Sequence, residues 1–264
     1  MAEINSKPPL VAVTMGDPAG IGPEIVAMAL RQIDTQRACR VVVVGDETAM
    51  ARAFEILGDV DCLMRVSNME SSHLLGSGPC LLPVSSLLES EIRFARPSVD
   101  AAAATIDYIR QAATAAKAGV VDAICTAPIN KGVLKQTGFA FPGHTEFLQH
   151  LTGARRTVML LAGSSLRVSL VTIHAALAEV PDLLNVGLVT ETIALTYRSL
   201  VEDFDIGRPR LAVAGLNPHA SDGGLFGDEE QRIIDPAVSH CRQQGIDVRG
   251  PLPPDAVYYQ AHQG

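Results

Sequence analysis

Two histidines each follow an apolar run, at the point where a β-strand would end. His174 follows the run Leu166–Ile173, and His219 follows the run Leu211–Leu216. The carboxyl ends of neighbouring parallel strands lie at one edge of a sheet, so both imidazoles can point into one cleft. Two neutral imidazoles suit Zn²⁺ or another divalent ion, together with a third ligand and an open position. Taken singly, a histidine in this position is more often a hydrogen-bonded structural residue, and it is the occurrence of two at analogous strand ends that favours the metal interpretation. No third ligand is evident from the sequence; Asp222, three residues after His219, is the acidic residue nearest to that histidine.

A second group of polar residues precedes a run that is typical of a helix. His144 and Thr145 follow Pro142-Gly143, and both side chains can donate hydrogen bonds to an oxygen-rich ligand at a helix start. The structural alternative is that Thr145 is the N-cap of this helix. Lys131 lies just beyond an apolar run and can contact a phosphate or a carboxylate, or it is a solvated lysine at a helix start.

A glycine-rich loop, GDPAGIGPE at residues 16–24, separates an apolar run from a helix-like stretch. Free N–H groups at a helix start favour an anion. The glycine order is GxxxGxG, which differs from the GxGxxG fingerprint, and no Gly-Lys-Ser/Thr follows. The pattern therefore does not support a classical Rossmann cofactor site, and a tight strand-to-helix connection is the alternative. His73, His150, His240 and His262 lack such contexts and are predicted to be surface or helix residues.

The elements that must position these groups alternate between short apolar runs and helix-like stretches. Predicted strands cover residues 11–15, 41–44, 62–66, 80–84, 121–126, 158–161, 166–173 and 211–216, and predicted helices cover 23–33, 46–57, 99–117, 147–153, 186–204 and 228–244. Asp46 and Ser98 are predicted N-caps. This order predicts an α/β fold with a mostly parallel sheet. A composition shift suggests two domains, at residues 1–125 and 126–264.

The overall composition narrows the class of protein. Hydrophobic residues make up 47% of the 264 residues, enough for a sizeable core, and the net charge is 21 − 29 = −8, which disfavours nucleic-acid binding. Five cysteines without a CxxC pair indicate a reduced compartment. The first ten residues contain no apolar signal-peptide core, and the apolar runs are too short to span a membrane. A cytoplasmic location is expected.

Five segments carry a family resemblance: MGDPAGIGPE, TAPINK, PGHTEFL, TIH followed by AAL, and GLNPHASDGGLFGDEE. Their combination and order resemble the 4-hydroxythreonine-4-phosphate dehydrogenase family of pyridoxal phosphate biosynthesis, from residue 11 to GPLPPD at 250–255. The resemblance implies a fold like that of isocitrate and isopropylmalate dehydrogenases, with two α/β domains and a cleft between them. It also implies binding of NAD or NADP without a GxGxxG loop.

The resemblance extends to individual residues. It implies that His144 and Thr145 contact the substrate, that His174 and His219 are two of three metal-binding histidines, and that Lys131 and Asp255 lie in segments near the active site. The third family histidine belongs to a YHDQG motif that would follow the last residue here, so an incomplete site is expected. The family places its active site at a homodimer interface.

The implied reaction is oxidation of 4-phosphohydroxy-L-threonine by NAD or NADP, with a divalent ion (zinc, magnesium or cobalt). The 3-oxo acid product loses CO₂ to give 3-amino-2-oxopropyl phosphate, in pyridoxine 5'-phosphate biosynthesis. Three alternatives stay open. The first is a dehydrogenase of D-threonate or D-erythronate 4-phosphate, the second is a metal-dependent phosphohydrolase using the same histidines, and the third is a non-catalytic binding protein.

Overall fold

The chain forms two compact units, Met1–Thr157 and Val158–Gly264. The computed structural model describes residues 8–32, 38–71 and 78–263, so predicted His73 lies outside the described residues. The predicted domain boundary after residue 125 differs from this division. The strand that ends at Thr126 pairs inside the sheet of the first unit, and the helical segments that follow pack on helix α4 (Val99–Lys117) of the same unit.

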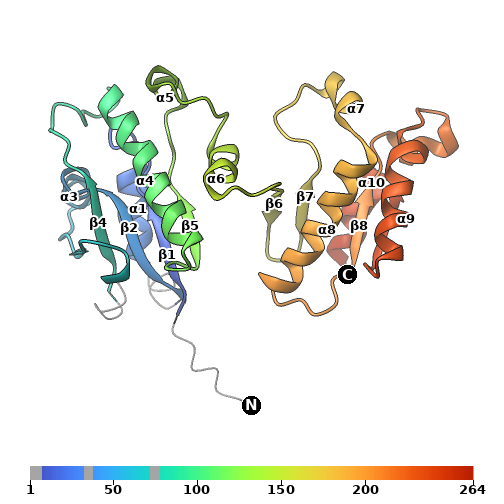
Figure 1. The fold of residues 1–264 in the computed structure, drawn as a ribbon, viewed down its shortest axis with the longest axis horizontal. Helices are drawn as coiled ribbons and strands as arrows, with labels where there is room; N and C mark the ends of the chain where they lie inside the picture. The colour runs from blue at the N-terminus through green and yellow to red at the C-terminus, as the bar shows by residue number, and fades with distance from the viewer. Residues whose placement is uncertain (1–7, 33–37, 72–77, 264) are drawn as a thin grey trace, which may run out of the picture. The chain divides into compact units, whose positions relative to one another are not determined.

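The first unit is built on a five-stranded parallel sheet in the order β3-β4-β2-β1-β5 (Figure 1). Its strands are β1 (Leu10–Thr14), β2 (Arg40–Asp46), β3 (Met64–Arg65), β4 (Cys80–Ser85) and β5 (Ala123–Thr126). Six of the seven residues of β2 are buried, as expected for a central strand covered on both faces. The predicted α/β class with a parallel sheet is confirmed.

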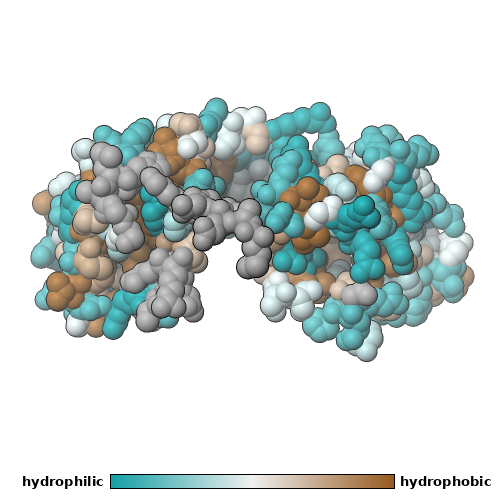
Figure 2. All heavy atoms as spheres, turned by 90° about the horizontal axis from the view of Figure 1, so that it is seen from below, coloured by the Kyte–Doolittle hydropathy of each residue, from teal (hydrophilic) through white to brown (hydrophobic). Residues whose placement is uncertain are grey.

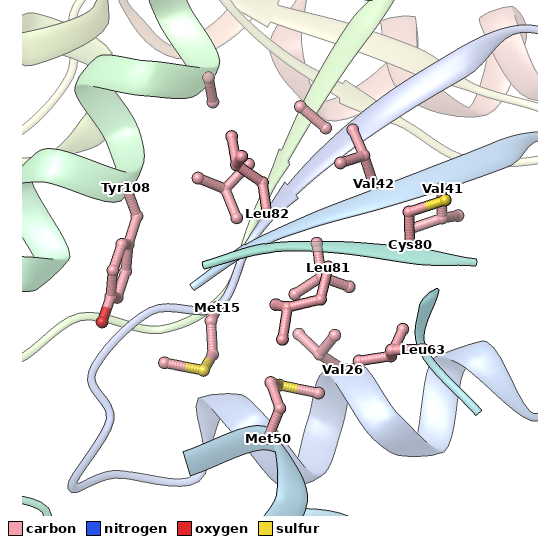
Figure 3. Packing of buried hydrophobic residues seen from close by; sticks show 14 of the residues in the cluster. Met15, Val26, Val41, Val42, Met50, Leu63, Cys80, Leu81, Leu82 and Tyr108 are labelled. Atoms are coloured by element: carbon pink, nitrogen blue, oxygen red, sulfur yellow. The ribbon is translucent and has the colours of Figure 1, made fainter. Parts of the chain in front are cut away.

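Helices cover both faces of this sheet. α1 (Gly22–Leu30) and α3 (Glu47–Ile56) pack against each other, and α4 lies on the opposite face (Figures 1 and 3). The predicted caps are confirmed: Asp46 accepts a hydrogen bond from the backbone of Ala49, and Ser98 accepts one from Ala101. The short α5 (Lys131–Leu134), the 3₁₀ turn η2 (Lys135–Thr137) and α6 (His144–Thr152) complete the unit.

The core of the first unit is formed mainly by small aliphatic side chains, which suits a chain with few aromatic residues. Figure 3 shows Val26 of α1 and Met50 of α3 near β4, and Tyr108 projecting from α4. Tyr108 is fully buried, and its hydroxyl lies 2.5 Å from the Ser85 hydroxyl. Ser85 in turn donates to the buried Asp46 carboxylate. The polar groups of Tyr108, Ser85 and Asp46 are therefore paired with one another inside this core.

The second unit contains two small sheets and several helices. An antiparallel hairpin joins β6 (Met159–Ala162) to β7 (Arg167–Leu170), as predicted, and β8 (Leu211–Ala214) pairs in parallel with β9 (Val248–Leu252). The helical segments are η3 (Leu177–Glu179), α7 (Val180–Leu183), α8 (Val186–Glu202), η4 (Pro218–Gly224), the π-turn η5 (Glu230–Ile234), α9 (Asp235–Gln243) and α10 (Pro254–Gln263).

Hydrophobic residues are scattered among hydrophilic ones on the face drawn in Figure 2. Within the described part of the chain, no helix has both the length and the apolar character needed to cross a membrane. His150, His240 and His262 lie on helices α6, α9 and α10 and are exposed, as predicted.

Candidate active site

The first polar group lies at the carboxyl ends of β1 and β5, which are neighbours in the sheet. The chain leaves β1 toward α1 on one face of the sheet, and it leaves β5 toward α5 and α6, which contact α4 on the other face. Adjacent strands whose connections leave toward opposite faces open a crevice where ligands bind. The glycine-rich loop after β1 and the segment Ala127–Lys131 after β5 therefore meet at a favourable place for a site.

Asp17 links these two segments. Its backbone N–H donates to the carbonyl of Pro128 at 3.0 Å, and its side chain accepts a hydrogen bond from the backbone of Ala19 at 2.9 Å. Burial raises the pKa of Asp17, although hydrogen bonds from Ala19 and from the Asn130 side chain act against that rise. This buried carboxyl group holds the loop in place through the Ala19 hydrogen bond, and its raised pKa favours the protonated form more than in an exposed aspartate.

Gly16 makes this close approach possible. Its φ of +77° lies in the left-handed region, and a Cβ atom here would overlap the Pro128 carbonyl oxygen and lie 3.0 Å from the carbonyl carbon of Ala127. Thr105 of α4 also contacts the loop, since its hydroxyl lies 3.2 Å from the Gly16 carbonyl oxygen. The glycine is therefore required by the contact between the two strand ends, and it explains part of the glycine-rich pattern.

His144 and Thr145 lie in the first turn of α6. The helix begins at His144 and its N-cap is Gly143, without a side-chain cap, so the alternative of Thr145 as N-cap is wrong. The Nε2 atom of His144 is buried and has no hydrogen-bond partner among the described residues. Burial lowers the pKa of His144, and the positive charge of Lys131 lowers it further. The imidazole is therefore neutral near pH 7 and can offer one donor and one acceptor.

Three phenylalanines pack together beside the first turn of α6. Phe139, Phe141 and Phe147 form a cluster with ring centroids 5.0 to 5.4 Å apart, and Phe147 is only 4% exposed. Their contacts fix the loop before α6 to the helix itself. Lys131 lies on the same side, because its Nζ atom is 3.6 Å from the position a Cβ atom would take on Gly143. The structure thus brings His144 and Lys131 together in the first unit.

The two predicted metal-binding histidines belong to the second unit, and both have unusual backbones. β7 ends at Leu170, earlier than predicted, and an irregular segment leads to His174, which has a φ of +53°. His219 has a φ of +54° and begins six consecutive residues with positive φ, through Gly224. Left-handed backbone costs about 1–2 kcal/mol per residue other than glycine, so this turn must be held by its surroundings.

The turn is tied to the end of β8 by an acidic residue that sequence reasoning missed. Glu230 is 2% exposed, and its carboxylate accepts a hydrogen bond from the Asn217 backbone at 2.7 Å and one from the Asn217 side chain at 3.0 Å. Burial alone would raise the pKa of Glu230, but these hydrogen bonds outweigh it and lower the pKa. Ser221, inside the turn, donates to the carbonyl of Gly227 at 2.6 Å.

His219 and Asp255 face each other across this part of the second unit. The Nδ1 atom of His219 lies 3.8 Å from the Oδ2 atom of Asp255, and the two side chains are 65% and 63% exposed. An imidazole nitrogen and a carboxylate oxygen are ligands that zinc and similar divalent ions take. Among residues 8–32, 38–71 and 78–263, however, no group of three or more His, Cys, Asp and Glu side chains is placed to hold a metal ion. The pair fits part of a metal site.

A cavity of about 800 Å³ also lies in the second unit, lined by β7, β8, α8 and α10. Its lining is largely aliphatic and includes none of His174, His219 and Asp255. Asp17 and Glu230 are the functional candidates that the sequence did not identify; only the position of Asp17, directly after a strand and a glycine, offered a signal.

A family model and several named relatives match most of the chain. The family model described as "Pyridoxal phosphate biosynthetic protein PdxA" matches residues 37–264. A 4-hydroxythreonine-4-phosphate dehydrogenase from Geobacter metallireducens is 46% identical over 263 residues, covering 98% of this chain and 76% of that relative. A D-threonate 4-phosphate dehydrogenase from Cupriavidus necator is 38% identical over 258 residues, covering 97% of this chain and 77% of that relative.

A solved structure gives the same result for the fold. The 4-hydroxythreonine-4-phosphate dehydrogenase from Burkholderia phymatum has a TM-score of 0.87 and 38% sequence identity, covering 98% of this chain and 78% of that chain. The fold class predicted from the five segments is therefore confirmed.

Proposed function

Because the chain belongs to the PdxA family of pyridoxal phosphate biosynthetic proteins, we propose that it oxidises 4-phosphohydroxy-L-threonine. The secondary alcohol loses a hydride to a nicotinamide cofactor and a proton to solvent. The resulting 3-oxo acid loses CO₂, which gives 3-amino-2-oxopropyl phosphate. The observation that carries this proposal is the 46% identity to a relative with this activity in its name, over 98% of the chain.

The residues of the first unit supply groups that suit this substrate. The substrate carries a phosphate, a carboxylate and a hydroxyl group, and the Lys131 ammonium can pair with either anion. His144 is kept neutral by burial and by Lys131, so its ring can donate to one substrate oxygen or accept from the hydroxyl. Thr145 adds a hydroxyl donor one residue further along α6. These three residues bind and orient the substrate in the proposal.

The residues of the second unit are proposed to hold a divalent ion. His219 and Asp255 would provide two ligands, and His174 a further one. A divalent ion held there supplies a positive charge that lowers the pKa of an alcohol and draws electron density during loss of CO₂. A nicotinamide cofactor would supply the hydride acceptor, and the protein would orient it. Two imidazoles and a carboxylate suit zinc and cobalt better than magnesium, which prefers oxygen ligands. NAD and NADP are both compatible with the proposal.

Two further features come with the family resemblance. We propose a homodimer whose active site draws on both subunits, and a cytoplasmic enzyme that works under reducing conditions. The five cysteines are all free thiols, which is consistent with a reducing compartment. Sedimentation or light scattering of the purified chain tests the dimer, since a monomer at all concentrations would contradict it.

The activity is tested with the purified chain, the phosphorylated substrate, and NAD⁺ or NADP⁺ in the presence of Zn²⁺, Mg²⁺ or Co²⁺. The proposal predicts growth of the reduced-nicotinamide absorbance and release of CO₂. Release of phosphate without cofactor reduction would instead support the phosphohydrolase alternative. Substrate binding without either product would support a non-catalytic binding protein.

A second substrate deserves the same assay. The relative from Cupriavidus necator carries D-threonate 4-phosphate dehydrogenase in its name and is 38% identical. Its substrate has a hydroxyl group where 4-phosphohydroxy-L-threonine has an amino group, next to the carboxylate. The proposal for the amino substrate fails if kcat/KM is higher for D-threonate 4-phosphate.

A further inference from the structure

The left-handed turn His219–Gly224 is held by groups outside itself. All six residues have positive φ, and four of them (His219, Ala220, Ser221 and Asp222) are not glycine. Only glycine, and occasionally asparagine or aspartate, adopts this backbone readily. Residues kept in such conformations persist where the surrounding structure determines them. The contacts on either side of the turn therefore decide where the ring of His219 lies.

Two carboxylates hold the start of the turn: the Asn217 side chain donates to Glu229 at 2.7 Å, and Glu230 accepts from both the backbone and the side chain of Asn217. Glu230 receives these two N–H groups of Asn217, the residue two positions before His219, at 2.7 and 3.0 Å. Its Oε1 atom also lies 3.0 Å from the position a Cβ atom would take on Gly215, so the carboxylate fits closely against the end of β8. Glu230 is 2% exposed, so its carboxylate is largely shielded from water that would compete for these hydrogen bonds.

The left-handed turn also packs on α10, the helix that carries Asp255. η4 contacts both η5, which contains Glu230, and α10, which contains Asp255. Glu230 itself lies in a π-turn, a local widening of a helix that is frequent at functional sites. The widened turn and the buried carboxylate lie behind the loop, while His219 and Asp255 face outward at 3.8 Å from each other.

We propose that Glu230 is a positioning residue, which anchors Asn217 and thereby presents His219 beside Asp255. This inference rests on the proposed role of His219 as a metal ligand, although the anchoring itself can be tested without any metal. Partner groups behind metal ligands typically change metal affinity 10- to 100-fold when they are altered.

The test uses Glu230→Gln in the whole chain, which keeps the size of the side chain but replaces one of the two oxygens that accept from Asn217 with an NH₂ group. Amide hydrogen exchange and nuclear Overhauser contacts between the His219 ring and α10 report the position of the turn. We expect exchange at Asn217 to accelerate at least tenfold and the ring contacts to be lost, with protection in β9 and α9 retained. Asn217→Ala, which removes only the side-chain donor, should change the same signals less.

A matched control is Asp228→Asn, which removes one carboxylate two residues away. Asp228 is exposed, and its side chain contacts Arg232 of η5. The control should leave exchange at Asn217 and the His219 contacts unchanged. Wild-type exchange and wild-type ring contacts in Glu230→Gln would overturn the proposal.

Calorimetric titration with Co²⁺ alone measures metal binding, and it tests whether the anchoring by Glu230 matters for the proposed metal site. We expect Glu230→Gln to bind Co²⁺ at least tenfold more weakly than the wild-type chain. If the wild-type chain binds no Co²⁺, the metal assignment of His219 fails while the exchange and ring-contact results still decide the role of Glu230. If Glu230→Gln is too unstable to measure, Asn217→Ala decides: faster exchange at residue 217 and weaker His219 ring contacts support the anchoring, and wild-type signals overturn it.

Discussion

The backbone N–H of Asp17 donates to the carbonyl of Pro128 at 3.0 Å, and this contact joins the loop after β1 to the segment after β5. The two strands are neighbours, so the contact closes the carboxyl edge of the sheet at the place where connections diverge to opposite faces. Lys131 follows only three residues after Pro128. The placement of a proposed substrate-binding lysine thus depends on a glycine loop more than a hundred positions earlier in the sequence.

Replacing Gly16 with alanine should destabilise the first unit by more than about 2 kcal/mol. The new Cβ would overlap the Pro128 carbonyl, and the φ of +77° is unfavourable for alanine as well. The measurement is the free energy of unfolding in urea. Gly58→Ala is a matched control, because Gly58 also has a positive φ but nothing within 4 Å of the new Cβ, so it should cost only about 1 kcal/mol. Equal losses in the two variants would contradict the steric explanation.

Asp46→Ala should be more damaging than Ser98→Ala, although both residues are helix caps. The buried Asp46 carboxylate accepts from the backbones of Ala49 and Leu87 and from the Ser85 hydroxyl, so its loss leaves three donors unpaired. We expect a cost of about 3–5 kcal/mol for Asp46→Ala and about 1 kcal/mol for Ser98→Ala. Urea unfolding of both variants checks this order, and a larger loss in Ser98→Ala would contradict it.

Local chemistry made most of the first unit predictable. A polar residue before an apolar helical pattern identified the caps Asp46 and Ser98, and continuous valine runs identified the buried strand β2, because these effects act within a few residues. The cap of α6 was not predictable in this way. Gly143 takes the cap position with an extended backbone and no side-chain hydrogen bond, so residue type carried no signal.

In the second unit, the features that the sequence did not predict depend on contacts between residues that are far apart along the chain. The stretch 228–244 is helical from residue 229 to 243, as predicted, but the sequence did not predict the π-turn η5 that precedes α9 within it. Glu230 is charged and would be expected on the surface, yet it is buried because Asn217 supplies two donors. Histidine, alanine and serine rarely adopt left-handed backbone, so the turn after Pro218 is visible only in the folded chain.

Lys131→Met should raise the pKa of His144 toward its ordinary value of 6.5, because the variant removes the positive charge that disfavours the imidazolium. The measurement is an NMR titration of the His144 ring. Lys135→Met is the control: it also removes an exposed lysine, one turn further along, and should leave the midpoint unchanged. A midpoint that falls in Lys131→Met would contradict the proximity of the two side chains.

The lowered pKa of His144 also predicts a pH dependence of stability. The unfolded chain binds a proton near pH 6.5, whereas the folded chain binds it only at lower pH. The contribution of neutral His144 to the free energy of unfolding is therefore complete above pH 6.5. It is lost as the pH falls from 6.5 to the lower pKa of the folded state. Unfolding free energies of the wild type and of His144→Gln, measured from pH 8 to pH 5, should diverge in this window. Parallel curves would contradict the prediction.

Asparagine variants of the proposed metal ligands separate function from folding. His174 and His219 have positive φ, and asparagine tolerates this backbone better than alanine. Both residues and Asp255 are exposed, so His174→Asn, His219→Asn and Asp255→Asn should each change stability by less than about 0.5 kcal/mol. Each should weaken Co²⁺ binding and turnover at least tenfold, as measured by calorimetry and by cofactor reduction. His240→Asn, on the exposed face of α9, should change neither. Wild-type Co²⁺ affinity in His219→Asn would reject this residue as a ligand.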